Sequence, residues 1–172
     1  MDSRDKNVRR IAGLLAILLL VSLSSLDAQQ KPGPIKLEDP ELYLAFFRSH
    51  AAIDEVIQKG GAAAQQATSS NSSLYHVSAD DFGKLTSEVR KFMGGLAAWQ
   101  AKEQAYVTQQ RVAKKLPDMK ILVDFMHQRQ RLVMNAHGSV HGALTSASWD
   151  GLHTYINGDF QASLSQKKGA VK

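Results

Sequence analysis

Cysteine is absent from the 172-residue sequence. Without thiols the chain can form no disulfide framework, no thiolate zinc site and no covalently attached c-type haem. A lipid-anchored lipoprotein, which needs a cysteine beside its cleavage site, is excluded as well. The folded domain must therefore be held together by its apolar core.

Catalytic sequence motifs are also absent. The chain has no glycine-rich phosphate loop, no nucleophile elbow and no pair of carboxylates in a context that would form a cleft. The sequence therefore predicts a protein that is not an enzyme and that needs no cofactor. A small enzyme with an unrecognised site is an alternative that composition alone leaves open.

Strong charge of one sign is missing too. The 21 basic and 16 acidic residues give a net charge of +5 at neutral pH. The basic residues are spread along the chain, and they do not alternate with aromatic residues as they do in a nucleic-acid groove. We therefore expect no binding to nucleic acid.

One long uncharged run is mostly apolar, at residues 11–26. Basic residues precede it, and the small residue Ala28 follows. This order is typical of a secretory signal peptide, so we expect residues 1–28 to be removed and the protein to be secreted or periplasmic. The run is shorter than the about 20 residues of a membrane span. An uncleaved N-terminal membrane anchor is the alternative, and it is the one membrane attachment that we expect.

Proline marks where the folded domain begins. Residues 29–38 hold two of the four prolines and are expected to form an extended leader. Asp39 followed by Pro40 is typical of a helix start, with aspartate as the N-cap and proline in the first turn. We therefore expect a helical bundle domain over residues 39–164.

Two stretches are expected to lack regular structure. Gly60 and Gly61 are typical of a helix end. The small, polar composition that follows predicts a flexible loop at residues 60–77. The chain is polar beyond Phe160, and residues 165–172 are expected to form a disordered basic tail.

The strongest periodic signal is a heptad on either side of Pro117. Apolar residues recur at alternating steps of three and four from Phe82 to Trp99, and again from Met119 to Ala143. These patterns predict two long helices that form an antiparallel, coiled-coil-like hairpin. The expected facing pairs are Trp99 with Val133, Phe92 with Val140 and Tyr106 with Met126. With a first helix after Pro40 and a short last helix capped by Ser146 or Ser148, the sequence predicts an all-α antiparallel bundle of about four helices.

One charged layer interrupts this hairpin. Glu103 and Arg129 each break the apolar stripe of their own helix, and the predicted register places them opposite each other. We expect a structural ion pair that fixes the register of the hairpin. The alternative is a buried carboxylate tuned for acid–base chemistry.

Half of the six histidines lie between Asn135 and Ile156. His137 and His141 are four residues apart and share one face of a helix, and His153 follows. Such spacing can place two imidazoles on one metal ion, but nothing fixes the number of ligands that a zinc site needs. We therefore expect no metal site, and we interpret these histidines as half-buried packing residues. A metal or non-covalent haem site is the alternative.

Glycines recur in the same region. Gly138 and Gly142 line one side of their predicted helix, where each is less favourable than alanine by about 1 kcal/mol. We interpret them as sites of close packing against the last helix, which carries Gly151. A hinge or a ligand groove is the alternative.

These observations together predict an exported, non-catalytic helical protein that acts by binding a partner protein or a second copy of itself. The first alternative is an extracytoplasmic metal- or haem-binding bundle that uses His137 and His141. The second alternative is the small enzyme mentioned above.

Overall fold

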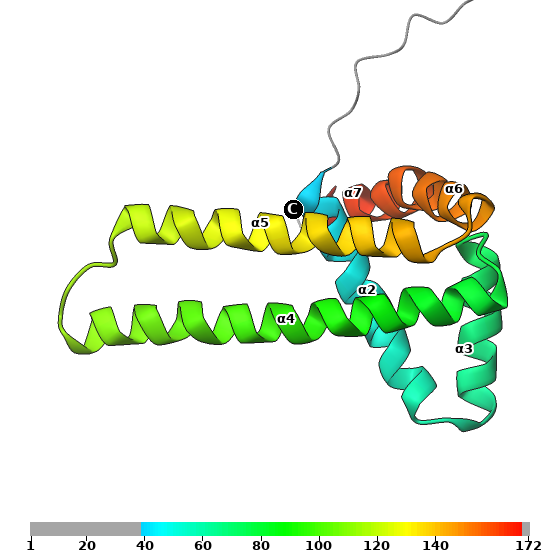
Figure 1. Cartoon of the computed structure of the whole chain (residues 1–172), viewed down its shortest axis with the longest axis horizontal. Helices are drawn as coiled ribbons and strands as arrows, with labels where there is room; N and C mark the ends of the chain where they lie inside the picture. The colour runs from blue at the N-terminus through cyan, green and yellow to red at the C-terminus, as the bar shows by residue number, and fades with distance from the viewer. Residues whose placement is uncertain (1–38, 170–172) are drawn as a thin grey trace, which may run out of the picture. The chain divides into compact units, whose positions relative to one another are not determined.

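The structure, a computed structural model, describes residues 39–169. The predicted signal peptide, the predicted leader and the last three residues of the predicted tail lie outside the described residues. All regular structure in the described part is helical, as expected (Figure 1). Within this part, no helix is both long enough and apolar enough to cross a membrane.

The helices follow one another along the chain with short connections. Their bounds are α2 Pro40–Gln58, α3 Gly61–Leu74, α4 Ala79–Val112, α5 Met119–Ala143, α6 Ser146–Tyr155, the π-helical segment η1 Ile156–Phe160, and α7 Gln161–Gly169.

Helix α2 begins where the sequence predicted. The Asp39 side chain accepts a hydrogen bond from the backbone N–H of Glu41, and Pro40 occupies the first turn. Proline is tolerated in the first turn because a backbone N–H at that position has no acceptor inside the helix, so its absence costs no hydrogen bond. The helix buries apolar residues on several sides and crosses both long helices of the fold.

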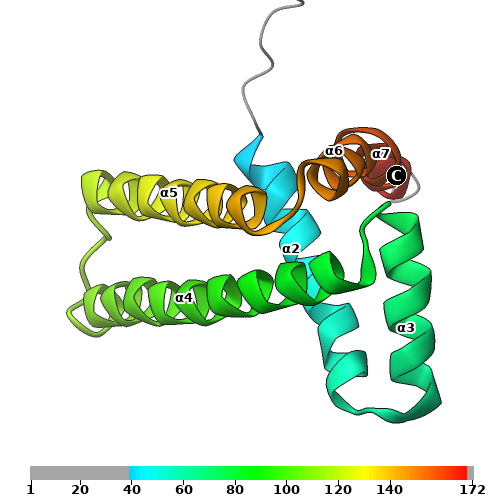
Figure 2. The same ribbon diagram turned by 45° about the vertical axis from the view of Figure 1, so that its right-hand side comes forward.

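Residues 60–77 do not form the flexible loop that their composition suggested. Residues 61–74 form α3, which packs beside α2 and α4 (Figure 2). Gly60 and Gly61 both have positive φ angles and make the reversal between α2 and α3. The alanine-rich composition of this segment is compatible with a helix. Its weak amphipathic pattern does not reveal a buried face, and packing against α2 stabilises the helix.

Helices α4 and α5 run antiparallel, side by side, and are joined by residues 113–118 (Figures 1 and 2). Ser78 caps α4 by accepting a hydrogen bond from the Asp81 N–H, and Asp118 caps α5 in the same way from the Lys120 N–H. The Asp118 N–H in turn donates to the Tyr106 hydroxyl at 2.8 Å. This bond ties the turn of the hairpin to α4.

The two halves of this hairpin have different surroundings. Near the other helices, the seam residues are buried: Phe92, Trp99, Val133 and Val140. Away from them, α4 and α5 have only each other, and both figures show this part projecting beyond the rest of the described helices. We call residues 103–126 the distal hairpin.

Packing in the distal hairpin differs from the predicted register. The Phe125 ring lies 5.9 Å from that of Tyr106 and 6.3 Å from that of Trp99, measured between ring centroids. Met126, which was expected to face Tyr106, is 43% exposed. The seam of α5 here is therefore formed by Phe125, and a regular coiled coil along the whole hairpin stays a prediction.

The last part of the chain is longer and more ordered than expected. Thr145, not Ser146 or Ser148, caps α6, and its hydroxyl accepts the hydrogen bond from the Ser148 N–H. Helix α6 continues through η1 into α7, which ends at Gly169. Residues 165–169, predicted to be a disordered tail, are thus helical.

The core is an aromatic cluster centred on Phe46 of α2. Its ring contacts those of five residues at centroid distances of 5.4–6.5 Å: Phe47, His50, Tyr75, Tyr155 and Phe160. These residues come from α2, the α3–α4 connection, α6 and η1. The cluster therefore joins the N-terminal and C-terminal helices.

Among the described glycines, one is tightly packed, and it is not one of the two that the sequence suggested. A Cβ atom at Gly138 or Gly142 would meet no atom within 4 Å, so the predicted close packing of these glycines is wrong. At Gly151 of α6, a Cβ atom would lie 2.7 Å from both the Cβ and the carbonyl oxygen of His76. His76 itself has a positive φ of 55°.

We therefore expect opposite effects from two glycine-to-alanine substitutions. Gly151→Ala should lower the free energy of unfolding by about 1–3 kcal/mol, because the backbone at His76 must move. Gly142→Ala should raise it by up to about 1 kcal/mol, because it gains helix propensity without a clash. Urea unfolding of both variants checks this, and a stable Gly151→Ala protein would contradict the close approach of α6 to His76.

Candidate functional site

The three histidines of the predicted cluster do come together, around Trp149 of α6. The indole ring lies 5.0 Å from the ring of His137, 4.5 Å from that of His141 and 5.6 Å from that of His153, between centroids. The ring of Tyr43 also lies 4.5 Å from that of His137. Trp149 thus lies among the imidazoles. The sequence predicted that Trp149 is on the apolar side of the last helix, against the preceding helix, but not that it contacts all three histidines.

This arrangement favours packing over metal binding. Aromatic rings at these distances make favourable stacked or edge-to-face contacts. Three imidazoles that share a metal must instead point their nitrogens at one position about 2 Å away. Within residues 39–169, no group of three or more histidine, aspartate or glutamate side chains could hold a metal ion.

The charged layer of the hairpin is not the predicted one. Arg129 of α5 pairs with Glu41 in the first turn of α2, where its Nη2 donates to Oε1 of the carboxylate. Glu103 is half-buried and forms no ion pair with Arg129. The prediction failed because hairpin register alone cannot reveal a partner supplied by another helix.

The Glu41–Arg129 pair should contribute little stability. Both side chains are partly exposed, at 56% for Glu41 and 30% for Arg129. Exposed pairs are typically worth no more than about 1 kcal/mol. In a double-mutant cycle, Glu41 and Arg129 should show coupling of this size, and Glu103→Leu should be additive with Arg129→Met. Coupling of several kcal/mol between Glu103 and Arg129 would instead show that these two residues form the predicted ion pair across the hairpin.

The buried Asp81 side chain links α4 to the α5–α6 turn through hydrogen bonds. Its Oδ2 accepts hydrogen bonds from the Thr145 hydroxyl at 2.6 Å and from the Thr145 N–H at 3.2 Å. Its Oδ1 accepts from Lys84 Nζ at 2.7 Å. Lys84 and then Thr145 hold the pKa of Asp81 well below its usual range. A carboxylate kept charged and saturated with donors serves structure and cannot act as a general acid at neutral pH.

His50 is the most buried titratable imidazole described. Its Nε2 lies 3.0 Å from the Thr86 hydroxyl oxygen, and that hydroxyl donates to the Phe82 carbonyl at 2.9 Å. Since the hydroxyl proton is used, His50 must donate from Nε2, which leaves Nδ1 unprotonated. Nδ1 is buried without a hydrogen-bond partner in the described part of the chain. This fits a neutral core residue and offers no entry for a substrate.

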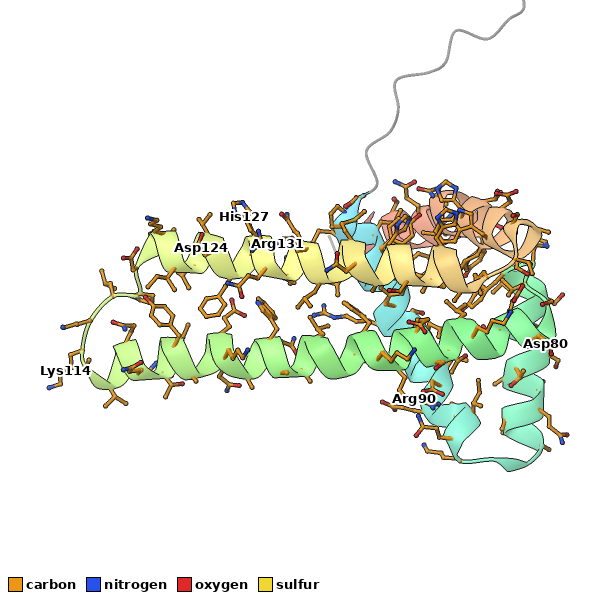
Figure 3. All side chains as sticks on the ribbon, in the orientation of Figure 1. Asp80, Arg90, Lys114, Asp124, His127 and Arg131 are labelled. Carbon is orange, nitrogen blue, oxygen red and sulfur yellow. The ribbon has the colours of Figure 1, made fainter. Side chains whose placement is uncertain are left out.

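A shallow groove of about 360 Å³ runs between α4 and α5 beside Gly95. Trp99 and Leu132 are among its lining residues, and Lys102 and Arg131 line it from opposite helices. Figure 3 labels Arg131 on α5, the helix that also carries Asp124 and His127. Lys102 is the one potential nucleophile among its lining residues, and no acidic side chain lines the groove beside it.

The most unusual surface is the turn of the hairpin, residues 111–120, which we call the hairpin tip. Leu116 is 92% exposed, Val112 79% and Met119 71%. Lys114 lies at the end of the hairpin that is furthest from the other helices (Figure 3). Sequence reasoning missed this surface because it assumed that the heptad seam was covered along its whole length.

The chain matches no family model, no curated protein and no solved structure. Its function is therefore argued from its own residues.

Proposed function

We propose that this is an exported, non-catalytic protein that acts by binding through its hairpin tip. The observation that carries the proposal is the exposure of Leu116, Val112 and Met119 together at the end of a projecting helical hairpin. Single apolar residues on a surface are ordinary, whereas several gathered at one projecting end are typical of an interaction site.

The helices outside the distal hairpin form the folded core, which supports a binding role for the tip and a structural role for the rest. Most large apolar residues of these helices are buried, although Val56 and Leu74 are 39% and 48% exposed. The buried polar groups Asp81 and His50 are engaged in structural hydrogen bonds. The distal hairpin adds little to that core. Its turn is nevertheless held in a defined conformation by the bond between Asp118 and Tyr106. A rigid element with an uncovered apolar end is suited to reaching a partner.

Export remains part of the proposal and rests on the order of basic, apolar and small residues before residue 29. Fractionation of the producing cells and the intact mass of the purified protein test it. We expect an extracytoplasmic protein that has lost residues 1–28. A cytoplasmic protein of full mass would contradict export without affecting the role of the hairpin tip.

Site-specific photo-crosslinking in the producing cells tests the binding role. A photoreactive residue at position 116 should give adducts, and one at the exposed position Gln65 of α3 should give few. Position 65 is a matched control because it is exposed on a helix away from the tip. Equal yields at both positions, or none at position 116, would contradict the proposal.

A further inference from the structure

The hairpin tip combines its apolar residues with positive charge. Four basic residues lie within it, Arg111, Lys114, Lys115 and Lys120, against the single acidic residue Asp118. Within the described residues, none of the four takes part in an ion pair, and the Asp118 side chain is engaged in capping α5. The tip therefore presents about three net positive charges around an apolar end.

The most exposed apolar residues of the hairpin lie at its turn. Ile121, Val123 and Met126 of α5 are 38%, 40% and 43% exposed. Met119, Val112 and Leu116, nearer the turn, are 71%, 79% and 92% exposed. The apolar surface is thus uncovered most at the end of the hairpin, and less along the sides of α5.

The contrast between the end and the sides of the hairpin distinguishes between possible occupants. A second copy packed alongside would cover the sides of the distal hairpin and leave its end in water. Two copies meeting end to end would bring two positive tips together, which is unfavourable. A planar, negatively charged surface with an apolar interior would match both the basic residues and the exposed apolar residues at the end of the hairpin.

We infer that the hairpin tip docks end-on to an anionic lipid bilayer surface. Leu116, Val112 and Met119 enter the boundary between head groups and acyl chains, and the lysines and Arg111 remain at the level of the lipid phosphates. Long basic side chains suit this position because their stems are apolar and their ends are charged. Apolar contact and basic charge together give stable but reversible attachment. The inference rests on the proposed function and names the partner of the same tip.

The absence of cysteine allows a clean test on the full chain. An environment-sensitive fluorophore is attached at Ala113→Cys in the tip or at Gln65→Cys on α3, both exposed positions. The probes are vesicles of phosphatidylcholine alone and vesicles that also contain phosphatidylglycerol. Because each fluorophore reports its own surroundings, attachment through the apolar N-terminal run would not imitate insertion of the tip.

We expect the fluorophore at position 113 to shift to the blue and brighten with the anionic vesicles, and the one at position 65 to change little. Lys115→Gln should weaken the apparent affinity roughly fivefold, the effect of one basic residue near an anionic surface. Lys59→Gln, which removes the same charge from the end of α2, should weaken it less than about twofold. Similar effects of the two lysine substitutions would overturn the inference.

The other outcomes are also informative. No response at position 113 to anionic vesicles would overturn the inference. A response that depends on protein concentration without vesicles would show a second copy as the occupant and overturn it as well. If the vesicles fail but position 116 crosslinks to a protein in cells, the proposed function stands and the lipid inference falls. If position 116 gives no adduct at all, the proposed function itself fails.

Discussion

Replacing Phe46 by alanine is expected to lower the free energy of unfolding by about 3–5 kcal/mol. Phe46 is fully buried and contacts five other rings that come from both ends of the described chain. The cavity left by its removal cannot close without moving α2 against α6 and η1. Urea unfolding followed by circular dichroism measures the loss.

Phe125→Ala is the matched control, because it removes the same side chain from the distal hairpin. Phe125 is only half-buried and contacts the rings of Trp99 and Tyr106. Its removal should cost clearly less than that of Phe46, since part of its surface already faces water. Equal costs would mean that the distal hairpin belongs to the core, and the division of roles proposed here would be wrong.

Acid is expected to destabilise the protein through His50 before its carboxylates are protonated. Burial lowers the pKa of His50 from 6.5 to about 4, against an opposing effect of the nearby Asp54 carboxylate. Because the folded pKa lies below the unfolded one, the unfolded chain binds the proton more tightly. The stability is therefore complete above pH 6.5 and declines as the pH falls toward 4, by about 2 kcal/mol between pH 7.5 and pH 5.

His50→Gln separates this effect from other titrations. Its free energy of unfolding should be lower at pH 7.5, but it should change little between pH 7.5 and pH 5. Asp81, whose pKa is depressed, loses its contribution only as the pH falls below its unfolded value of 3.8, outside this window. Wild type and His50→Gln with the same pH dependence between 7.5 and 5 would show that His50 is not buried in its neutral form.

The helices with strong local signals were predictable from the sequence. Asp39 with Pro40 predicted the start of α2, because capping depends on neighbouring residues alone. The all-helical class followed from the heptads on either side of Pro117. These features need no knowledge of distant contacts.

Features that depend on distant contacts were not predictable. The sequence predicted a loop in place of α3 because its small polar residues show little periodicity, whereas packing against α2 and α4 stabilises the helix. The partner of Arg129 lies 88 residues away, on a helix outside the hairpin. The tight position of Gly151 depends on the backbone of His76, which no pattern in the sequence indicates.

The candidate site was partly predictable. His137 and His141 were expected to share one helix face, but their common contact with Trp149, which also lies against His153, was not predicted. The hairpin tip was overlooked because Leu116 and Met119 look like ordinary apolar residues at a helix boundary. Their exposure is decided by the absence of other described helices around the distal hairpin, which is a property of the whole arrangement.

The most direct test of the central claim combines a triple substitution at the tip with crosslinking in the producing cells. Val112, Leu116 and Met119 are all changed to serine, and a photoreactive residue is placed at position 115. We expect the adduct yield at position 115 to fall to the level seen at position 65, while the free energy of unfolding changes by less than about 0.5 kcal/mol. An undiminished yield, or a loss of several kcal/mol of stability, would contradict a hairpin tip that serves binding and not folding.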